Sequence, residues 1–177
     1  MYAKMTQIKA ILFDIDGVLT NAQFTIDSSG GQSINFNVRD GQLLSFMRKN
    51  GYIFGAISGR DSACVRVRLE SLGIDFVRLG VQNKLTSLHE FLEMHSLEAE
   101  NVCFIGDDVI DLRVMDAVGL SAAPCDAVEL AKERADFVTS SSGGHGVLRE
   151  VIDLIINSRQ DLQKLLAEHY GFKYRNA

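Results

Sequence analysis

Short apolar runs alternate with longer amphipathic segments along nearly the whole chain. The apolar runs are almost free of polar residues, as expected for strands buried on both faces of a sheet, and they lie at residues 9–13, 52–58, 75–80, 101–106, 120–123 and 136–140. The segments between them repeat apolar residues every three or four positions and therefore predict helices. These helices lie at residues 41–51, 62–73, 84–95, 111–119, 126–135, 146–158 and 159–170. The alternation predicts an α/β fold, a Rossmann-like parallel sheet flanked by helices.

Glycines and small polar residues mark the ends of several predicted helices. Gly51, Gly73 and Gly119 follow helical segments, where a glycine can adopt the left-handed conformation that ends a helix. Ser62 and Asp126 precede helical segments, and their side chains can accept hydrogen bonds from the first backbone N–H groups. We therefore expect C-caps at the three glycines and N-caps at Ser62 and Asp126.

Residues 22–38 show a different pattern, in which apolar residues alternate with polar ones around a Ser-Ser-Gly-Gly sequence. This alternation predicts a β-hairpin inserted after the first strand, with one apolar face. The face would consist of Phe24, Ile26, Ile34, Phe36 and Val38. A lone hairpin is marginally stable in water, so this face should pack on the core or on another subunit. We favour another subunit.

The composition fits one domain that spans residues 1–177. The chain is 46% hydrophobic and has one proline, which provides enough apolar material for one sizeable core. Its net charge of −5 disfavours nucleic acids and anionic membranes as partners, because both need a basic surface. The N-terminal residues lack the apolar core of a signal peptide, and no apolar run approaches the length of a transmembrane helix. We therefore expect a cytoplasmic protein.

The cysteines and histidines do not indicate disulfide or zinc chemistry. The three cysteines are widely spaced, and the four histidines show no metal-binding spacing. No cysteine is followed six residues later by an arginine, so the active-site loop of the cysteine phosphatases is absent.

The most informative polar residues are Asp14 and Asp16, which follow the first apolar run and precede a glycine. Side chains two positions apart on a strand point to the same face, so the two carboxylates crowd one spot at the strand's end. Like charges at that distance need compensation, and a metal cation would provide it. Asp and Gly are also ordinary turn residues, so this motif alone leaves a turn and a site equally open.

Polar residues at further strand ends favour a site. Ser58 ends the second apolar run, Lys84 follows the third, and three aspartates follow the fourth. These aspartates are Asp107, Asp108 and Asp111. The carboxyl ends of parallel strands meet at one edge of the sheet, where ligands of such folds bind. Carboxylates bind Mg²⁺, and Ser58 and Lys84 can donate hydrogen bonds to phosphate oxygens, so we predict a site for Mg²⁺ and a phosphate.

These motifs, in this order, resemble the four motifs of the haloacid dehalogenase phosphatase superfamily. They are the sequence DIDGVLT at residues 14–20, Ser58, Lys84 and the sequence GDDVID at residues 106–111. The resemblance implies that Asp14 is the nucleophile that forms an aspartyl-phosphate. It also implies that Asp16 protonates the leaving alcohol and then activates water. Ser58 and Lys84 would complete the catalytic set by contacting the phosphate.

The same resemblance implies a magnesium site. The ligands would be Asp14, the backbone carbonyl of Asp16, and Asp107. Asp108 and Asp111 would lie behind these ligands and orient Asp107 and Lys84.

The distances between the motifs leave no room for a cap domain over the site. About forty residues separate Asp16 from Ser58, and about twenty-five separate Ser58 from Lys84, which is fewer than an independent domain needs. We therefore expect a capless member of the superfamily.

A narrower resemblance, to the bacterial 3-deoxy-D-manno-octulosonate 8-phosphate (Kdo 8-phosphate) phosphatases, covers nearly the whole chain. It rests on FNVRDG at residues 36–41, SGR at residues 58–60, GGHGVLREV at residues 143–151, and Arg68. Those enzymes are tetramers whose hairpins associate and whose neighbouring subunits help to close the site. The resemblance implies a homotetramer and a sugar-acid phosphate as substrate. The substrate contacts would be Asp16, Asn37, Val38, Arg39, Asp40, Gly41, Arg60, Arg68 and Lys84, and the two arginines suit the carboxylate of an acid sugar.

A few residues depart from the pattern of these phosphatases. Ser45 stands where they often carry a basic residue, and Gln42 and Leu43 replace an aromatic residue or leucine followed by glycine. Relatives that act on nonulosonate 9-phosphates, or that are fused to sugar-acid cytidylyltransferases, share most of the same motifs. A phosphatase for a nonulosonate 9-phosphate or another sugar phosphate is therefore the alternative enzyme.

Two other classes of protein remain open. A phosphoacceptor receiver domain also has Asp, Ser or Thr, and Lys at the strand ends of a parallel sheet, but its acidic pair is adjacent in sequence. The spacing of Asp14 and Asp16 disfavours that class. A binding protein with an inactive site is the second alternative, and the intact motifs argue against it. Mg²⁺-dependent release of phosphate from a simple ester would separate an enzyme from both.

Overall fold

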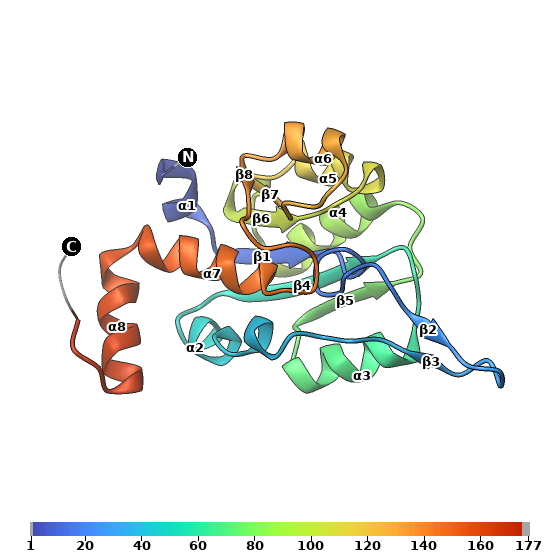
Figure 1. The fold of residues 1–177 in the computed structure, drawn as a ribbon. Coiled ribbons are helices and arrows are strands. Elements are labelled where there is room, and N and C mark those ends of the chain that lie inside the picture. The colour runs from blue at the N-terminus through green and yellow to red at the C-terminus, as the bar shows by residue number, and fades with distance from the viewer. Residues whose placement is uncertain (1, 175–177) are drawn as a thin grey trace.

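The computed structural model describes residues 2–174 and has a central sheet of six strands (Figure 1). The strands lie in the order β5-β4-β1-β6-β7-β8, and neighbouring strands are parallel. They are β1 (Ala10–Phe13), β4 (Ile53–Ser58), β5 (Phe76–Leu79), β6 (Val102–Ile105), β7 (Leu120–Ala123) and β8 (Phe137–Val138). Each strand lies within one of the apolar runs, so the predicted parallel sheet is confirmed.

Helices cover both faces of this sheet (Figure 1). In β1, Ile11 and Phe13 belong to one core cluster and Ala10 and Leu12 to the other, because side chains alternate along a strand. The first cluster includes residues of α2 (Leu44–Lys49), α3 (Ala63–Leu72) and α7 (Val147–Asn157). The second includes residues of α4 (Lys84–His95), α5 (Leu112–Met115) and α6 (Glu129–Arg134). The central strand is therefore held from both sides, and its carboxyl end is fixed.

Two further helices lie at the end of the sheet remote from the hairpin (Figure 1). The sequence pattern predicted α8 (Gln160–Tyr170), which packs against α7, and the ring of His169 lies 5.6 Å from that of Phe46 in α2. The pattern did not predict α1 (Tyr2–Gln7), a helix of six residues. Its Met5 side chain is buried in the core, so tertiary packing rather than local sequence stabilises this short helix.

The ends of α3 agree with the sequence prediction, and the end of α5 does not. Gly73 ends α3 in the left-handed conformation, with φ of +63°. Ser62 occupies the N-cap position, but within the described residues its side chain makes no capping hydrogen bond. The C-cap of α5 is Asp116, so the prediction for Gly119 is wrong. The N–H of Gly119 donates instead to the carbonyl of Ala99 at 2.9 Å, because the chain has already turned toward β7.

The prediction that Asp126 caps α6 is also wrong. The helix begins at Glu129, and the Asp126 carboxylate accepts a hydrogen bond from the N–H of Gly143 at 2.8 Å. At the end of α2 the C-cap is Asn50, and Gly51 follows it with φ of +84°. The glycine therefore marks the end of α2 within one residue.

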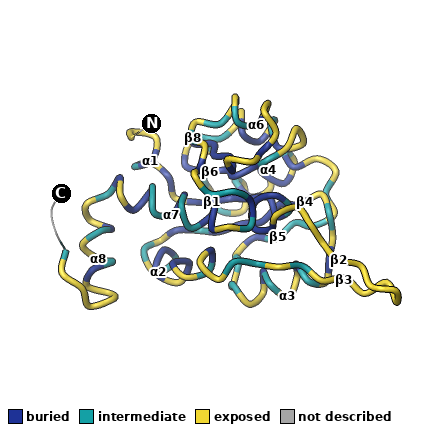
Figure 2. The backbone as a smooth tube through the Cα atoms, viewed as in Figure 1, coloured by how far each residue is buried: buried dark blue, intermediate teal, exposed yellow. Residues whose placement is uncertain are grey.

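The predicted hairpin is present and extends away from the sheet (Figures 1 and 2). Its strands, β2 (Thr25–Ile26) and β3 (Gln32–Ser33), are antiparallel and two residues long. The apolar face is divided, because Ile26 is 59% exposed whereas Ile34 and Phe36 pack against the core. The core therefore covers only Ile34 and Phe36 of the predicted face and leaves Phe24, Ile26 and Val38 exposed.

The insertions near the site are small. In the part of the chain that the structure describes, the hairpin, η1 (Val38–Gly41) and α2 form the connection between β1 and β4, and α3 forms the connection between β4 and β5. The expected capless architecture is confirmed. None of the helices within residues 2–174 combines the length and apolar character that a membrane crossing requires.

Candidate active site

The two aspartates after β1 lie at the carboxyl edge of the sheet. Asp14 continues the strand, since its N–H donates to the carbonyl of Ile105 at 2.9 Å, and the residue is buried. The chain then turns at Gly17, where φ is +90°. A methyl group on this glycine would lie 1.9 Å from Oδ2 of Asp107. Glycine therefore allows the turn to pass close to the second acidic motif.

Lys84 connects the first and the second acidic motif within the protein interior. Its Nζ lies 2.8 Å from Oδ1 of Asp14 and 2.7 Å from Oδ1 of Asp111, and all three residues are buried. Burial alone would lower the pKa of Lys84, but the two carboxylates raise it above its ordinary value. The lysine therefore carries a positive charge beside Asp14.

Asp111 orients the second acidic motif rather than facing the cavity. Its Oδ2 accepts hydrogen bonds from the N–H groups of Asp107 at 3.1 Å and Asp108 at 3.4 Å, while its Oδ1 binds Lys84. Asp108 caps η3 (Val109–Asp111) by accepting from the first N–H of that helix at 2.6 Å. Both carboxylate oxygens of Asp111 are therefore occupied, which supports the orienting role expected from the sequence.

The remaining carboxylates fit a divalent cation. Oxygens of Asp14 and Asp107 lie within 4.8 Å of each other and of the occupied Asp111 carboxylate, and Oδ1 of Asp107 is buried with no hydrogen-bond partner among residues 2–174. Burial raises the pKa of Asp14 to about 6, although Lys84 opposes the rise. Burial and the charge of Asp14 raise the pKa of Asp107 to about 8. The positive charge of Lys84 does not fully compensate the negative charge of these carboxylates, so a further cation would be favourable here. Mg²⁺ prefers oxygen ligands of this kind.

Asp16 faces a different cation, the guanidinium of Arg60. Nε and Nη2 of Arg60 lie 2.8 Å and 2.5 Å from the two carboxylate oxygens of Asp16. The ring of Phe24, from the hairpin, lies 4.6 Å from the guanidinium carbon, and Ser58 Oγ accepts from the Arg60 N–H at 3.2 Å. The structure therefore brings Arg60 to the site and pairs it with the predicted general acid. The contact with Phe24 was not foreseen, because the alternation indicated only an apolar face.

These residues line one cavity at the end of the sheet. The lining residues are Asp14, Asp16, Ala22, Ser58, Gly59, Arg60, Asp107, Asp108 and Ile110. Lys84 lies beneath this cavity, where it contacts Asp14.

The segment from Asn37 to Gly41 does not line this cavity in a single chain. Asn37 Oδ1 accepts from the N–H of Arg39 at 2.9 Å, and its carbonyl accepts from Nη2 of Arg68 at 3.1 Å. Asp40 is 2% exposed, and its Oδ1 accepts from the N–H of Arg149 at 3.1 Å, at the start of α7. Asp40 therefore binds the first turn of α7, and it is not among the residues that line the cavity. Contact between this segment and a substrate remains a prediction.

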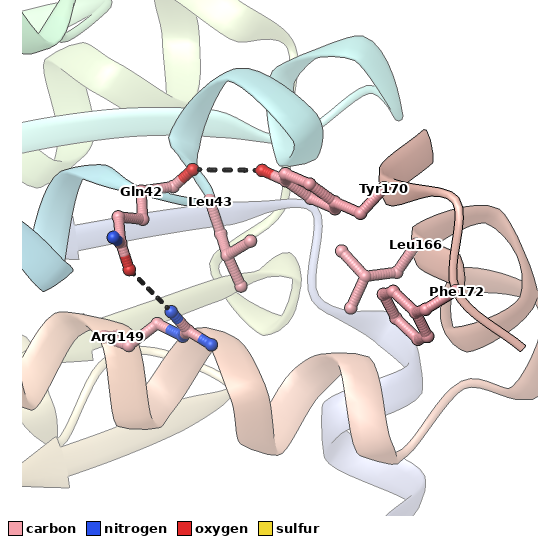
Figure 3. A pocket seen from close by; sticks show the side chains of 6 residues that line it. All are labelled: Gln42, Leu43, Arg149, Leu166, Tyr170 and Phe172. Carbon is pink, nitrogen blue, oxygen red and sulfur yellow. Dashed lines mark hydrogen bonds between the residues drawn. The ribbon is translucent and has the colours of Figure 1, made fainter. Parts of the chain in front are cut away.

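A second cavity lies between α8 and the chain before α2 (Figure 3). Its lining consists of Gln42, Leu43, Arg149, Leu166, Tyr170 and Phe172. The polar groups bind one another, since Arg149 Nη1 donates to Gln42 Oε1 at 3.2 Å and the Tyr170 hydroxyl donates to the Gln42 carbonyl at 3.3 Å. With its polar groups paired and no acid among its lining, this cavity lacks the chemistry of the first one. Gln42 thus has a structural role in docking α8.

Comparison with known proteins identifies the family. A family model for haloacid dehalogenase-like hydrolases matches residues 67–151, which include Lys84 and the second acidic motif. The 3-deoxy-D-manno-octulosonate 8-phosphate phosphatase of Escherichia coli K12 is 38% identical over 162 residues, which cover 92% of this chain and 86% of that protein. The chain belongs to the family of these phosphatases. The resemblance inferred from the motifs is therefore confirmed.

Solved structures of this family share the fold. A phosphatase of the same name from Moraxella catarrhalis, in complex with magnesium ion, phosphate ion and a KDO molecule, matches with a TM-score of 0.90 and 32% identity. The match covers 95% of this chain and 97% of that one. The cobalt-bound phosphatase from Haemophilus influenzae matches with a TM-score of 0.84 and 36% identity, over 88% of this chain and 91% of that one.

Proposed function

We propose that this protein is a Mg²⁺-dependent phosphatase that hydrolyses the terminal phosphate of a 2-keto sugar acid, namely Kdo 8-phosphate. The observation that carries the proposal is the buried group of Asp14, Lys84 and Asp107 at the carboxyl end of β1. It occurs in a chain that is 38% identical to a phosphatase of that name. The substrate named for the relatives also carries both a phosphate and a carboxylate, and two cationic side chains are near: Arg60 lines the cavity, and Lys84 lies beneath it beside Asp14.

In the first step, a carboxylate oxygen of Asp14 attacks phosphorus, and the bond from phosphorus to the sugar oxygen breaks. Asp16 gives its proton to that oxygen, which leaves as the alcohol. In the second step, Asp16 takes a proton from water, and the water oxygen attacks the aspartyl-phosphate. Phosphate leaves and the Asp14 carboxylate is restored. Lys84 and Ser58 hold the phosphate oxygens during both steps.

The magnesium ligands would be Asp14, the backbone carbonyl of Asp16, and Asp107. The ion would supply positive charge to the phosphate oxygens as the transfer proceeds. Asp108 and Asp111 would keep Asp107 in place.

In this proposal the substrate carboxylate releases Asp16 from its ion pair with Arg60. Arg60 now occupies both oxygens of Asp16, so Asp16 cannot reach a leaving oxygen while the pair persists. A substrate carboxylate can bind Arg60 in the same bidentate manner. When the substrate carboxylate replaces the Asp16 carboxylate on Arg60, Asp16 would be free for proton transfer.

The active form is proposed to be a homotetramer. The hairpin exposes Phe24 and Ile26, and α3 exposes 67% of Val67 beside Ile34 and Phe36. Apolar residues in such positions favour contact with another subunit. Since Asn37 to Gly41 and Arg68 do not line the cavity of their own chain, their proposed substrate contacts would be made at the site of a neighbouring subunit. A cytoplasmic location belongs to the same proposal.

A panel of phosphate esters tests the substrate. Kdo 8-phosphate, a nonulosonate 9-phosphate and glucose 6-phosphate would be compared with purified protein, with and without Mg²⁺. We expect Mg²⁺-dependent phosphate release and the highest kcat/KM for Kdo 8-phosphate. A preference for the nonulosonate ester would move the assignment to the alternative substrate. Absence of turnover with all three esters would refute the phosphatase function.

A further inference from the structure

Two glycines, Gly143 and Gly144, pack directly against the loop that follows the two aspartates, residues 17–21. The N–H of Gly144 donates to the carbonyl of Val18 at 3.0 Å. A methyl group on Gly143 would lie 2.2 Å from the carbonyl oxygen of Gly17. A side chain at position 143 therefore cannot be accommodated unless this loop moves.

Two observations indicate that only glycine fits at position 144. Its φ is +72°, a conformation that residues with a side chain rarely adopt. A methyl group there would also lie 2.7 Å from the backbone nitrogen of Asn21 and 2.8 Å from the carbonyl carbon of Thr20. The glycine pair and the loop thus touch backbone to backbone.

Thr20 connects this contact to Asp16. It is fully buried, and its hydroxyl donates to the carbonyl of Ile15 at 3.3 Å and lies 3.4 Å from Oδ1 of Asp16. The N–H groups of Leu19 and Thr20 donate to the same carbonyl at 3.0 Å and 3.1 Å. The loop is therefore a closed turn, and a displacement of Thr20 would move Asp16 with it.

The glycine pair is itself held from the opposite side. Oδ1 of Asp126 accepts from the N–H of Gly143 at 2.8 Å, and Nδ1 of His145 lies 2.8 Å from the Gly143 carbonyl. The other side of the loop faces Asp107, which a methyl group on Gly17 would meet. The loop is therefore confined between the second acidic motif and the glycine pair.

We propose that Gly143 and Gly144, held by Asp126, are positioning residues that fix Asp16 above the nucleophile. This inference rests on the proposed phosphatase function. Asp16 must reach the leaving oxygen with its carboxylate and Mg²⁺ with its backbone carbonyl, and a misplacement of about 1 Å can lower a catalytic rate by about a hundredfold. The glycine pair touches neither substrate nor metal and acts through the loop.

The test compares Gly144→Ala with Gly171→Ala. Gly171 has the same φ of +72°, but among residues 2–174 no atom beyond its two chain neighbours lies within 4 Å of a methyl group placed there. Gly171→Ala therefore reports only the cost of a left-handed alanine. We expect Gly144→Ala to lower kcat by about ten- to a hundredfold with a smaller change in KM, and Gly171→Ala to keep the wild-type kcat.

Mg²⁺ affinity, measured by calorimetry without substrate, provides a readout that does not depend on turnover. Gly144→Ala should bind Mg²⁺ more weakly than Gly171→Ala, because the Asp16 carbonyl moves. Equal kcat and equal Mg²⁺ affinity in the two variants would overturn the proposal. If the wild type released no phosphate, the proposed function would fail, and the Mg²⁺ affinities would still decide the positioning role.

Asp126 provides a second test if Gly144→Ala does not fold. Asp126→Ala removes the acceptor of the Gly143 N–H and introduces no clash. It should lower kcat, and Asp126→Asn, which keeps an acceptor oxygen, should recover most of the loss. Wild-type kcat and Mg²⁺ affinity in Asp126→Ala would refute the role of this support.

Discussion

In the proposed reaction Asp14 and Asp107 must be ionised, but their burial favours the protonated form. A nucleophilic carboxylate must be ionised, yet burial raises the pKa of Asp14 to about 6 and that of Asp107 to about 8. Near neutral pH the pair therefore retains a proton on Asp107 unless a cation takes its place. Lys84 supplies one positive charge beside Asp14. A bound Mg²⁺ would supply the rest and keep both carboxylates ionised.

Asp14→Asn should remove nearly all turnover, by about 10⁴-fold or more, because an amide cannot attack phosphorus. The fold should persist, since Lys84 keeps its ion pair with Asp111. Steady-state kinetics and thermal unfolding would measure both effects. Asp116→Asn, which changes an exposed aspartate paired with Arg134, is the matched control and should leave turnover unchanged. Substantial activity in Asp14→Asn would refute the nucleophile assignment.

Arg60→Ala should change substrate preference rather than abolish activity. Without the guanidinium, kcat/KM for a sugar-acid phosphate should fall by about a hundredfold, because a bidentate ion pair to the carboxylate is lost. Turnover of glucose 6-phosphate should fall far less, because Asp16 is released from its pair with Arg60.

Arg66→Ala is the control for that experiment. Arg66 lies in α3, the helix that follows Arg60 in the chain, is exposed and pairs with Asp61, so its loss should leave both substrates unaffected. Equal losses on the two substrates in Arg60→Ala would contradict carboxylate recognition by Arg60.

The sequence predicted strands and helices correctly where interactions between residues close in the chain determine them. The run at residues 101–106 became β6, and Gly73 ended α3 as expected. Asp126 was wrongly predicted as a helix cap, and the contact of Asp40 with α7 was not foreseen, because their partners are distant in sequence. Asp126 binds the N–H of Gly143, and Asp40 binds that of Arg149, 109 residues away. A short-range pattern contains no information about such contacts.

The hairpin is the element whose packing the single chain leaves incomplete. Ile26→Asp should weaken self-association, because a charge would be placed on the exposed apolar tip. Activity should fall with it if a neighbouring subunit closes the site. Sedimentation velocity at micromolar concentration and kinetics would measure the two effects.

Ser28→Asp, in the polar turn of the same hairpin, is the matched control and should leave the assembly intact. A wild-type protein that sediments as a compact monomer would refute the tetramer. An assembly that survives Ile26→Asp would exclude the hairpin tip from the interface.

The active site depends on the whole sheet, because its residues come from four separate strand ends. The rule that ligands bind at the carboxyl edge of a parallel sheet was sufficient to place Asp14, Ser58, Lys84 and Asp107 together before the structure. That rule could not predict the ion pair between Asp16 and Arg60, which are 44 residues apart. Such pairing depends on how two loops approach each other above the sheet, which the strand order does not determine.

Removal of Mg²⁺ should make the stability of the whole protein fall as pH rises. The pKa of Asp14 is raised to about 6 and that of Asp107 to about 8, compared with about 3.9 for an aspartate in an unfolded chain. At pH values between the pKa of the unfolded chain and those of the folded protein, the folded protein binds more protons than the unfolded chain. The free energy of unfolding therefore decreases from about pH 4 to about pH 8.

Mg²⁺ should reverse most of this decrease, because it binds the ionised carboxylates of the folded protein only. The difference in Tm between Mg²⁺ and EDTA should therefore widen from about pH 5 to about pH 8. Asp107→Asn should lose most of that difference and flatten the curve in EDTA. Asp40→Asn is the control, because burial also raises the pKa of Asp40 to about 6 but Asp40 lies away from the cavity, so it should keep the Mg²⁺ response. A Tm difference that stays constant across this pH range would contradict the assignment of Asp14 and Asp107 as the metal-binding carboxylates.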